Sequence, residues 1–213
     1  KMKYKHVIWD WNGTLLDDRW LCVEGINQSL IKRSLPTITE DIYKKVFSFP
    51  VKDYYERLGF DFKNEPFEVA GDEFVAYYGK FFYKAKLHEK VAFVLDKISA
   101  AGFSQSILSA GKQEYLNIWV EEHKLSEYFT IIRGIDNQYA SGKIELGVSF
   151  MNEIPYDNNE IIMIGDTDHD SDVADAMGID CVLLDHGHMG VQRLQKTGRT
   201  IFSNMEEVLA FLV

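Results

Sequence analysis

The carboxylates of this chain gather at two places where they could do chemistry together. Asp10 directly follows the apolar run at residues 7–9 and precedes a Gly13-Thr14 turn. After a second apolar run, at residues 161–164, four more carboxylates follow: Asp166, Asp168, Asp170 and Asp172. Carboxylates this close repel one another unless a cation neutralises some of them, and their hard oxygens suit Mg²⁺. Both groups directly follow buried strands, which is where open α/β sheets bind their ligands.

Two simpler explanations of the second acidic group account for only part of it. An EF-hand loop that began at Asp166 would need glycine at position 171 and glutamate at position 177, and the chain has Ser171 and Met177 there. Acidic residues at the start of a helix, favoured by its dipole, explain Asp168 and Asp172. They explain Asp166 less well, because it comes directly after the apolar strand.

Both stretches resemble motifs of one known family. Residues 10–14, Asp-Trp-Asn-Gly-Thr, resemble the first motif of the haloacid dehalogenase-like hydrolases, Asp-x-Asp-Gly-Thr, with Asn12 in place of the second aspartate. Residues 165–167, Gly-Asp-Thr, resemble the fourth motif of that family. The resemblance implies a doubly wound parallel α/β sheet, a Rossmann-like core, that carries an inserted helical cap.

The resemblance also assigns catalytic and phosphate-binding roles. Asp10 would be the nucleophile that forms an aspartyl-phosphate. Ser109, Ala110 and Gly111 resemble the second motif, and their hydroxyl and backbone N–H groups would bind the substrate phosphate. Lys143 resembles the third motif and would orient the nucleophile and offset the phosphoryl charge.

The implied metal ion is Mg²⁺. Its ligands would be a carboxylate oxygen of Asp10, the backbone carbonyl of Asn12, and Asp166. Asp170 would act through water or as an occasional direct ligand. The resemblance thus predicts a Mg²⁺-dependent phosphohydrolase that acts on a small phosphorylated metabolite, of the phosphoglycolate-phosphatase type.

Some of these residues also have a structural explanation or a rival candidate. A serine ahead of a helix is often only its N-cap, so Ser109 is a weak signal by itself. Lys112 is a rival to Lys143 for the role of the lysine. His186 and His188 could be a metal pair, but their spacing indicates no third ligand and a polar loop is favoured.

Asn12 raises a question about the mechanism. In the phosphatases of the family, the second aspartate protonates the leaving group and then activates water, and such help contributes typically ~10²–10⁴-fold. Asparagine does neither, which predicts slow turnover of alkyl esters. Phosphonate-cleaving enzymes and dehalogenases of the family also replace this aspartate, so both activities stay open, as does a non-enzymatic phosphate-binding or phospho-aspartate domain. A phosphonatase would need a cap lysine, and the candidates are Lys32, Lys44, Lys45 and Lys52.

The remaining pattern supplies the elements that position these residues. Residues 17–85 carry apolar positions at helical spacing and no convincing strand, which predicts a helical cap. Thr39, ahead of Glu40 and Asp41, is expected to be the N-cap of one of its helices. Residues 1–16 and 86–213 alternate strand and helix, which predicts an α/β core. We expect a strand over residues 103–108 with Ser109, Ala110 and Gly111 in the loop after it. The expected core helices span residues 89–101, 113–123, 144–152, 173–177, 191–196 and 205–212. The aromatic residues at 74–83 are typical of an amphipathic helix that packs on its neighbours, although some of them could face a cleft.

Composition narrows the class further. The chain of 213 residues is 46% hydrophobic, enough for a sizeable core, and its formal net charge is −10. An acidic surface disfavours nucleic acid and anionic membranes as partners. Two cysteines, Cys22 and Cys181, give no disulfide framework and fit a reducing compartment. With no membrane span or signal peptide in the pattern, a cytoplasmic enzyme is expected, and the oligomeric state is not indicated.

Overall fold

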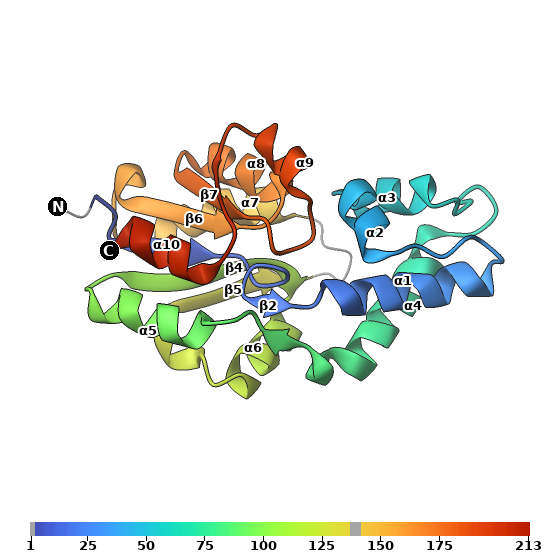
Figure 1. Cartoon of the computed structure of the whole chain (residues 1–213), viewed down its shortest axis with the longest axis horizontal. Helices are drawn as coiled ribbons and strands as arrows, with labels where there is room; N and C mark the ends of the chain where they lie inside the picture. Colours follow the sequence, from blue (N-terminus) through green and yellow to red (C-terminus); the bar gives the residue numbers. More distant parts are fainter. Residues whose placement is uncertain (1–2, 137–141) are drawn as a thin grey trace.

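A six-stranded parallel sheet lies at the centre of the molecule (Figure 1). This computed structural model describes residues 3–136 and 142–213. In spatial order the strands are β5 (Ile131–Ile135), β4 (Ser104–Lys112), β1 (His6–Trp9), β6 (Ile161–Gly165), β7 (Asp180–Leu184) and β8 (Thr200–Phe202). All five neighbouring pairs run parallel. The doubly wound parallel sheet that the sequence predicts is therefore confirmed.

Strand β1 occupies the middle of the sheet because its residues are apolar, apart from His6, whose ring forms hydrogen bonds with neighbouring side chains. All four are buried, and the strand pairs with β4 on one side and β6 on the other. In this register Trp9 lies opposite Ile107 and Ile164, so the residues after these three positions emerge at one edge of the sheet. Asp10 and the loop after β6 meet there.

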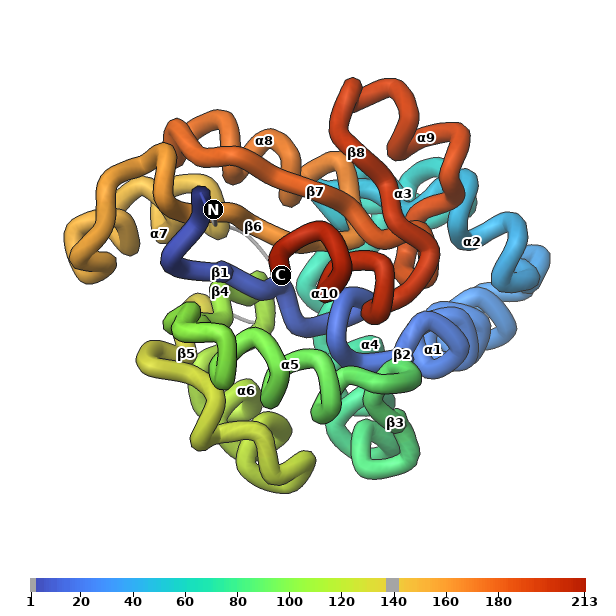
Figure 2. Tube along the Cα trace, turned by 60° about the vertical axis from the view of Figure 1, so that its left-hand side comes forward, coloured from blue at the N-terminus to red at the C-terminus, as the bar shows by residue number. Residues whose placement is uncertain are grey.

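Helices cover both faces of the sheet (Figures 1 and 2). On one face lie α5 (Val91–Ala100), α6 (Gln113–Glu122) and α10 (Met205–Leu212), and on the other lie α7 (Lys143–Phe150), α8 (Asp168–Met177) and α9 (Val191–Gln195). Short 3₁₀ turns connect some of these elements: η2 (Ser126–Tyr128), η3 (Met151–Glu153) and η4 (Asn158–Glu160). Each face has its own cluster of buried apolar side chains, as expected of a sheet that is hydrophobic on both sides.

The four helices between β1 and α5 form the cap, which extends from one end of the sheet (Figure 1). They are α1 (Arg19–Lys32), α2 (Glu40–Val46), α3 (Val51–Arg57) and α4 (Phe67–Phe81), followed by the 3₁₀ turn η1 (Phe82–Lys84). The predicted N-cap of α2 is confirmed, because the Thr39 side chain accepts a hydrogen bond from the Ile42 backbone N–H. Helix α4 packs along α1.

A second, two-stranded sheet joins the cap to the core. Strand β2 (Leu16–Asp17) pairs antiparallel with β3 (Lys86–Leu87), so the chain leaves the core and returns to it at neighbouring points. Strands of two residues carry no periodicity, and the sequence did not indicate them. The predicted boundaries of the cap, 17 and 85, fall beside this sheet and stay a prediction.

Buried His6 makes the stability of the sheet sensitive to acid. Its ring lies between the hydroxyls of Ser104 (2.6 Å) and Ser106 (2.8 Å), and burial lowers the pKa of His6 to about 4. In the unfolded chain this histidine takes up a proton near pH 6.5. Between pH 6.5 and pH 4 the unfolded state therefore binds more protons than the folded state. The free energy of unfolding falls as the pH falls through this range, by up to ~1.4 kcal/mol per pH unit. We expect His6→Gln to lose part of this slope in urea unfolding between pH 7 and pH 4.5. Identical slopes in the two proteins would contradict this assignment.

Candidate active site

Four charged side chains meet where β1 and β6 end. The Lys143 ammonium lies 2.8 Å from Asp10 Oδ1 and 2.8 Å from Asp170 Oδ1. Oxygens of Asp10, Asp166 and Asp170 lie within 4.8 Å of one another, in positions that could hold a metal ion. The structure therefore brings together the nucleophile, lysine and metal-ligand candidates from three distant parts of the sequence. Their chemical roles remain predictions.

The single positive charge of Lys143 is too small to neutralise the three carboxylates around it. Burial raises the pKa of Asp10, and the Asp170 carboxylate raises it further despite Lys143. Burial, Asp10 and Asp170 together raise the pKa of Asp166 well above its usual value. At Asp170 burial opposes ionisation too, but the Lys143 contact and a backbone N–H outweigh it and lower the pKa. A divalent cation would supply the missing positive charge, so this donor set of hard oxygens fits Mg²⁺.

Lys143 itself is almost fully buried. Burial alone would lower the pKa of Lys143, but Asp10 and Asp170 outweigh it and raise the pKa above its usual value. The ammonium therefore keeps its charge beside Asp10, which fits a group that orients a carboxylate. Lys112, the rival candidate, lies 3.3 Å from Glu114 instead.

Two glycines let the loops approach Asp166 closely. A Cβ atom on Gly13 or on Gly187 would lie 2.2 Å from Asp166 Oδ2. The backbone N–H of His188 donates to this oxygen (2.8 Å), and the Thr14 hydroxyl donates to Oδ1 (2.8 Å). Asp166 is thus fixed by backbone that only glycine permits at these positions.

The second-motif residues lie on an irregular strand end. We expected a strand over residues 103–108 followed by a loop, but β4 continues to Lys112, with a shift of register after Leu108. Ala110 and Gly111 line the pocket described below, and Ser109 is fully buried. Ser109 Oγ accepts a hydrogen bond from the Gly111 N–H (2.9 Å), so it shapes this turn.

Asn12 is oriented by two cap residues. Its Nδ2 donates to Asp18 Oδ2 (3.0 Å) and to the Tyr78 hydroxyl (3.0 Å), while that hydroxyl donates to Asp18 (2.8 Å). The Tyr78 hydroxyl donates its only proton to Asp18, so it can only accept a hydrogen bond from Asn12. The nitrogen of the Asn12 side-chain amide must therefore face Tyr78. Asn12 Oδ1 lies on the other side, 3.6 Å from where a Cβ of Gly111 would be.

His188 is part of the same network, which corrects one expectation. The sequence favoured a polar loop for His186 and His188; the segment is a loop, but His188 is buried. Its Nε2 lies 2.9 Å from Asp18 Oδ1, and its Nδ1 lies 2.5 Å from the Tyr43 hydroxyl. Cys22 lies close enough to Asp18 and His188 to form a group of three possible metal ligands, which the spacing of the histidines did not indicate.

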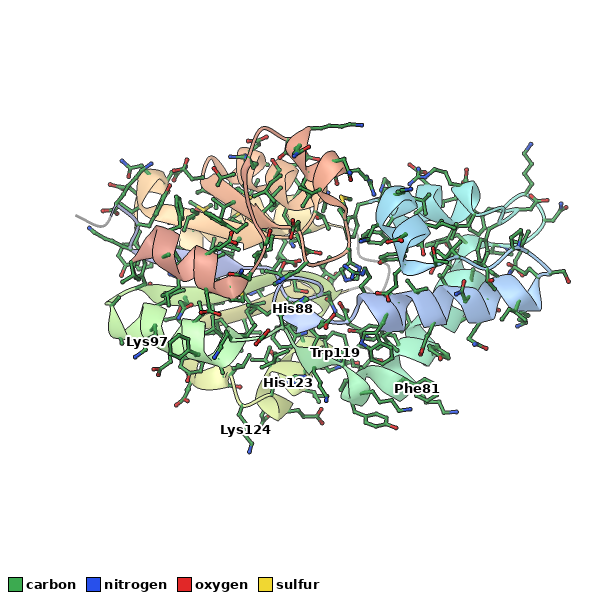
Figure 3. All side chains as sticks on the ribbon, in the orientation of Figure 1. Phe81, His88, Lys97, Trp119, His123 and Lys124 are labelled. Carbon is green, nitrogen blue, oxygen red and sulfur yellow. The ribbon has the colours of Figure 1, made fainter. Side chains whose placement is uncertain are left out.

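His186 and His88 fix the turn after β1 from outside. Their rings stack with centroids 3.5 Å apart (His88 is labelled in Figure 3). His88 Nε2 lies 2.9 Å from the Gly13 carbonyl, and His186 Nε2 lies 2.9 Å from the Thr14 carbonyl. Both histidines therefore support the loop that carries Asp10.

A pocket of about 210 Å³ opens above Asp10 and Lys143, between the core and the cap. Its cap side is largely aromatic, with the side chains of Tyr43, Phe47, Phe49, Tyr54, Tyr55, Phe67, Phe74 and Tyr78. Trp119 of α6, labelled in Figure 3, closes the core side and contacts the Tyr78 ring, with centroids 5.4 Å apart. The Tyr54 hydroxyl is buried without a hydrogen-bond partner.

The pocket also bears on two sequence expectations about the cap. The aromatic run at 74–83 does pack as an amphipathic helix, but Phe74 and Tyr78 face the pocket as well. Among the described residues, the lysines that line the pocket are Lys112 and Lys143, both from the core. The cap lysines considered for a Schiff base therefore lie elsewhere; Lys32, for example, pairs with Glu73.

Sequence reasoning missed Asp18 and Tyr43 as pocket residues and favoured a polar loop for His188, and it left open which aromatic residues of 74–83 face a cleft. Aspartate before a helix and tyrosine on an amphipathic helix are ordinary structural residues, and neither carries a motif. The one available signal was Gly187, because glycine between two histidines marks a place where backbone approaches another group closely.

Fold and site together define a Rossmann-like hydrolase with an inserted cap, and comparison with known proteins agrees. A family model described as haloacid dehalogenase-like hydrolase matches residues 7–184. The chain belongs to this family. A curated relative, tyrosine-protein kinase PtkA of Mycobacterium tuberculosis, is 21% identical over 203 residues, which cover 93% of this chain and 68% of the relative.

Solved structures share the whole fold at low identity. A haloacid dehalogenase-like hydrolase from Streptococcus pneumoniae has a TM-score of 0.85 at 18% identity and covers 99% of both chains. A predicted phosphatase from Clostridium acetobutylicum has a TM-score of 0.84 at 21% identity, covering 98% of this chain and 97% of that one. A predicted phosphoglycolate phosphatase from Haemophilus somnus has a TM-score of 0.81 at 17% identity, covering 98% of both chains. Among the described residues, no helix has the length and apolar character needed to cross a membrane.

Proposed function

We propose that this chain is a Mg²⁺-dependent phosphohydrolase that acts on a small phosphomonoester through an aspartyl-phosphate. The observation that carries the proposal is the placement of the Lys143 ammonium, 2.8 Å from both Asp10 and Asp170, at the floor of a pocket. A buried carboxylate held by a lysine and flanked by further carboxylates is suited to attack a phosphoryl group whose charge a metal ion and a lysine offset.

The chain's own residues would act in two steps. An oxygen of Asp10 attacks phosphorus as the bond to the leaving oxygen breaks, and Lys143 and the backbone around Ala110 and Gly111 hold the transferring oxygens. Water then attacks the aspartyl-phosphate, which releases inorganic phosphate and restores Asp10. Asp10, the Asn12 carbonyl, Asp166 and, through water or directly, Asp170 would hold Mg²⁺, which when bound neutralises the developing phosphoryl charge.

The alternatives within the fold have weaker support. A phosphonate hydrolase needs a lysine from the cap beside the substrate, and among the described residues the pocket lysines come from the core. A dehalogenase needs no Mg²⁺ and gives no reason for the buried group of Asp10, Asp166 and Asp170. A non-enzymatic phospho-aspartate domain would have no use for a pocket with an aromatic wall above the nucleophile.

The proposal is tested by phosphate release from a panel of phosphomonoesters, with Mg²⁺ and with EDTA. We expect release with Mg²⁺ and at least about 100-fold less with EDTA, since the metal carries much of the charge stabilisation. Binding of Mg²⁺ alone should raise the unfolding temperature, because a ligand at 100 times its Kd stabilises the folded state by ~2.7 kcal/mol. Equal release with EDTA, or release from no substrate, would refute the proposal.

A further inference from the structure

We infer that this site takes aryl phosphates, in which the phosphate is carried by an aromatic ring, in preference to alkyl phosphates and to phosphoglycolate. The inference rests on the proposed phosphohydrolase function and adds the chemical class of the leaving group. Two independent features carry it: the composition of the pocket wall above Asp10, and the hydrogen bonding of Asn12.

The pocket wall suits an aromatic ring and not a second anion. Its cap side is built from aromatic rings such as Tyr55, Phe67 and Phe74, and no described residue of 17–85 that lines it is cationic. Lys143 is engaged by two carboxylates, and Lys112 lies 3.3 Å from Glu114. A phosphoglycolate carboxylate that faced the cap side would therefore lie unpaired against apolar surface, which is costly. A ring would pack edge to face with the wall.

The volume fits one ring. An apolar cavity of about 150 Å³ is known to accept benzene. The pocket here measures about 210 Å³ and is partly open to solvent, so it has room for a single ring and a phosphate group.

Asn12 favours the same class of substrate through the chemistry of the leaving oxygen. The Asn12 amide hydrogens are used on Asp18 and Tyr78, and its other face offers only a carbonyl oxygen. Asp18 in turn accepts hydrogen bonds from Asn12 and Tyr78. The leaving oxygen therefore meets no proton donor at this position, and it must depart with its electron pair as an anion.

A phenolate is a far better leaving group than an alkoxide. The pKa of a phenol is about 10, whereas water, which an alkanol resembles, has a pKa of about 15.7. As the bond to phosphorus breaks, a phenolate leaves and takes a proton from solvent; water then displaces phosphate from Asp10 and gives up a proton. The balanced reaction is aryl phosphate plus water to phenol plus inorganic phosphate.

The test compares five substrates with saturating Mg²⁺: phenyl, 4-hydroxyphenyl, benzyl and hexyl phosphate, and phosphoglycolate. We expect kcat/KM for phenyl phosphate to exceed the values for hexyl phosphate and phosphoglycolate by about 100-fold or more, within the range of general-acid effects. Benzyl phosphate combines a ring with an alkyl leaving group. Its KM should therefore match the KM of phenyl phosphate, and its kcat should match the kcat of hexyl phosphate. The 4-hydroxyphenyl ester also has an aryl leaving group and should behave as the phenyl ester does.

Acetyl phosphate and two variants separate this inference from the proposed function. Acetyl phosphate has a good leaving group and no ring, so it reports phosphohydrolase chemistry alone. Phe74→Leu should lower kcat/KM for phenyl phosphate about tenfold, chiefly through KM, and lower it less for acetyl phosphate, which has no ring to pack on this wall. The matched control is Phe93→Leu, an exposed phenylalanine of α5 outside the pocket, which should change neither.

Two outcomes would overturn the inference in different ways. If acetyl phosphate is hydrolysed and phenyl phosphate is no faster than hexyl phosphate or phosphoglycolate, the aryl preference is wrong and the phosphohydrolase stands. If neither acetyl phosphate nor any of the five esters is hydrolysed with Mg²⁺, both proposals fail together.

Discussion

We expect Asp10→Asn to abolish phosphate release, with a fall in kcat on the order of 10⁴-fold or more, as for other enzymes that lose their nucleophile. The amide that replaces the carboxylate is a poor nucleophile and also loses the charge that Lys143 faces at 2.8 Å. Wild-type protein incubated with labelled acetyl phosphate and Mg²⁺ and then denatured should retain acid-stable, hydroxylamine-labile phosphate. The variant should retain none.

A matched control distinguishes loss of the nucleophile from loss of an acidic charge. Asp172→Asn removes a carboxylate from the same acidic segment, but this residue is exposed on α8 and does not line the pocket. Its activity should stay within about twofold of wild type, as is usual for surface substitutions away from a site. Circular dichroism and thermal unfolding would show whether both variants are folded. A folded Asp10→Asn protein with wild-type turnover would eliminate Asp10 as the nucleophile.

The second large effect is a gain of activity. Asn12→Asp should raise kcat for hexyl phosphate by about 100-fold and for phenyl phosphate by only a few-fold, because a general acid helps most where the leaving group is poorest. The new carboxyl group would face Asp18 Oδ2, which lies 3.0 Å from the present Asn12 Nδ2. Two carboxylates at this distance cannot both ionise, so one retains a proton, the state that a general acid requires.

Two variants serve as controls for this gain. Asn12→Ala removes the side chain without supplying a proton donor and should leave the ratio of hexyl to phenyl turnover unchanged. Combining Asn12→Asp with Asp18→Asn removes the neighbouring negative charge and should lower the pH at which alkyl turnover declines. Equal gains on both substrates from Asn12→Asp would count against proton transfer as the missing step.

Asp10 and Asp166 could be found from the sequence because the sheet itself places them, whereas Lys143 and Asp170, on α7 and α8, were assigned by the resemblance to the family. Apolar runs identify parallel strands, and the residues after neighbouring strands must emerge at the same edge. The positions of Asp10 and Asp166 after β1 and β6 follow from that rule. The approximate extents of α5 to α10 followed from apolar periodicity for the same reason, and the start of α8 at Asp168 is fixed by the Thr167 cap.

The pocket wall could not be predicted because it depends on how the cap packs on the core. His188, Asp18 and Tyr43 lie far apart in sequence and meet only through tertiary contacts. Each residue alone resembles a loop, cap or core residue, so no local pattern identifies it. The run of β4 to Lys112 was missed for a related reason: Ser-Ala-Gly reads as a turn until β5 supplies a partner strand.

The paired strands β2 and β3 have a consequence for how such a protein can diverge. Because Leu16 lies opposite Leu87, the two ends of the inserted segment are already joined before any cap helix is added. The entropy of closing that loop depends only weakly on its length. Exchange of residues 18–85 would therefore leave the sheet and the group of Asp10, Lys143 and Asp170 in place, but it would also replace Asp18 and Tyr78, so the cap that changes the substrate also changes the setting of Asn12.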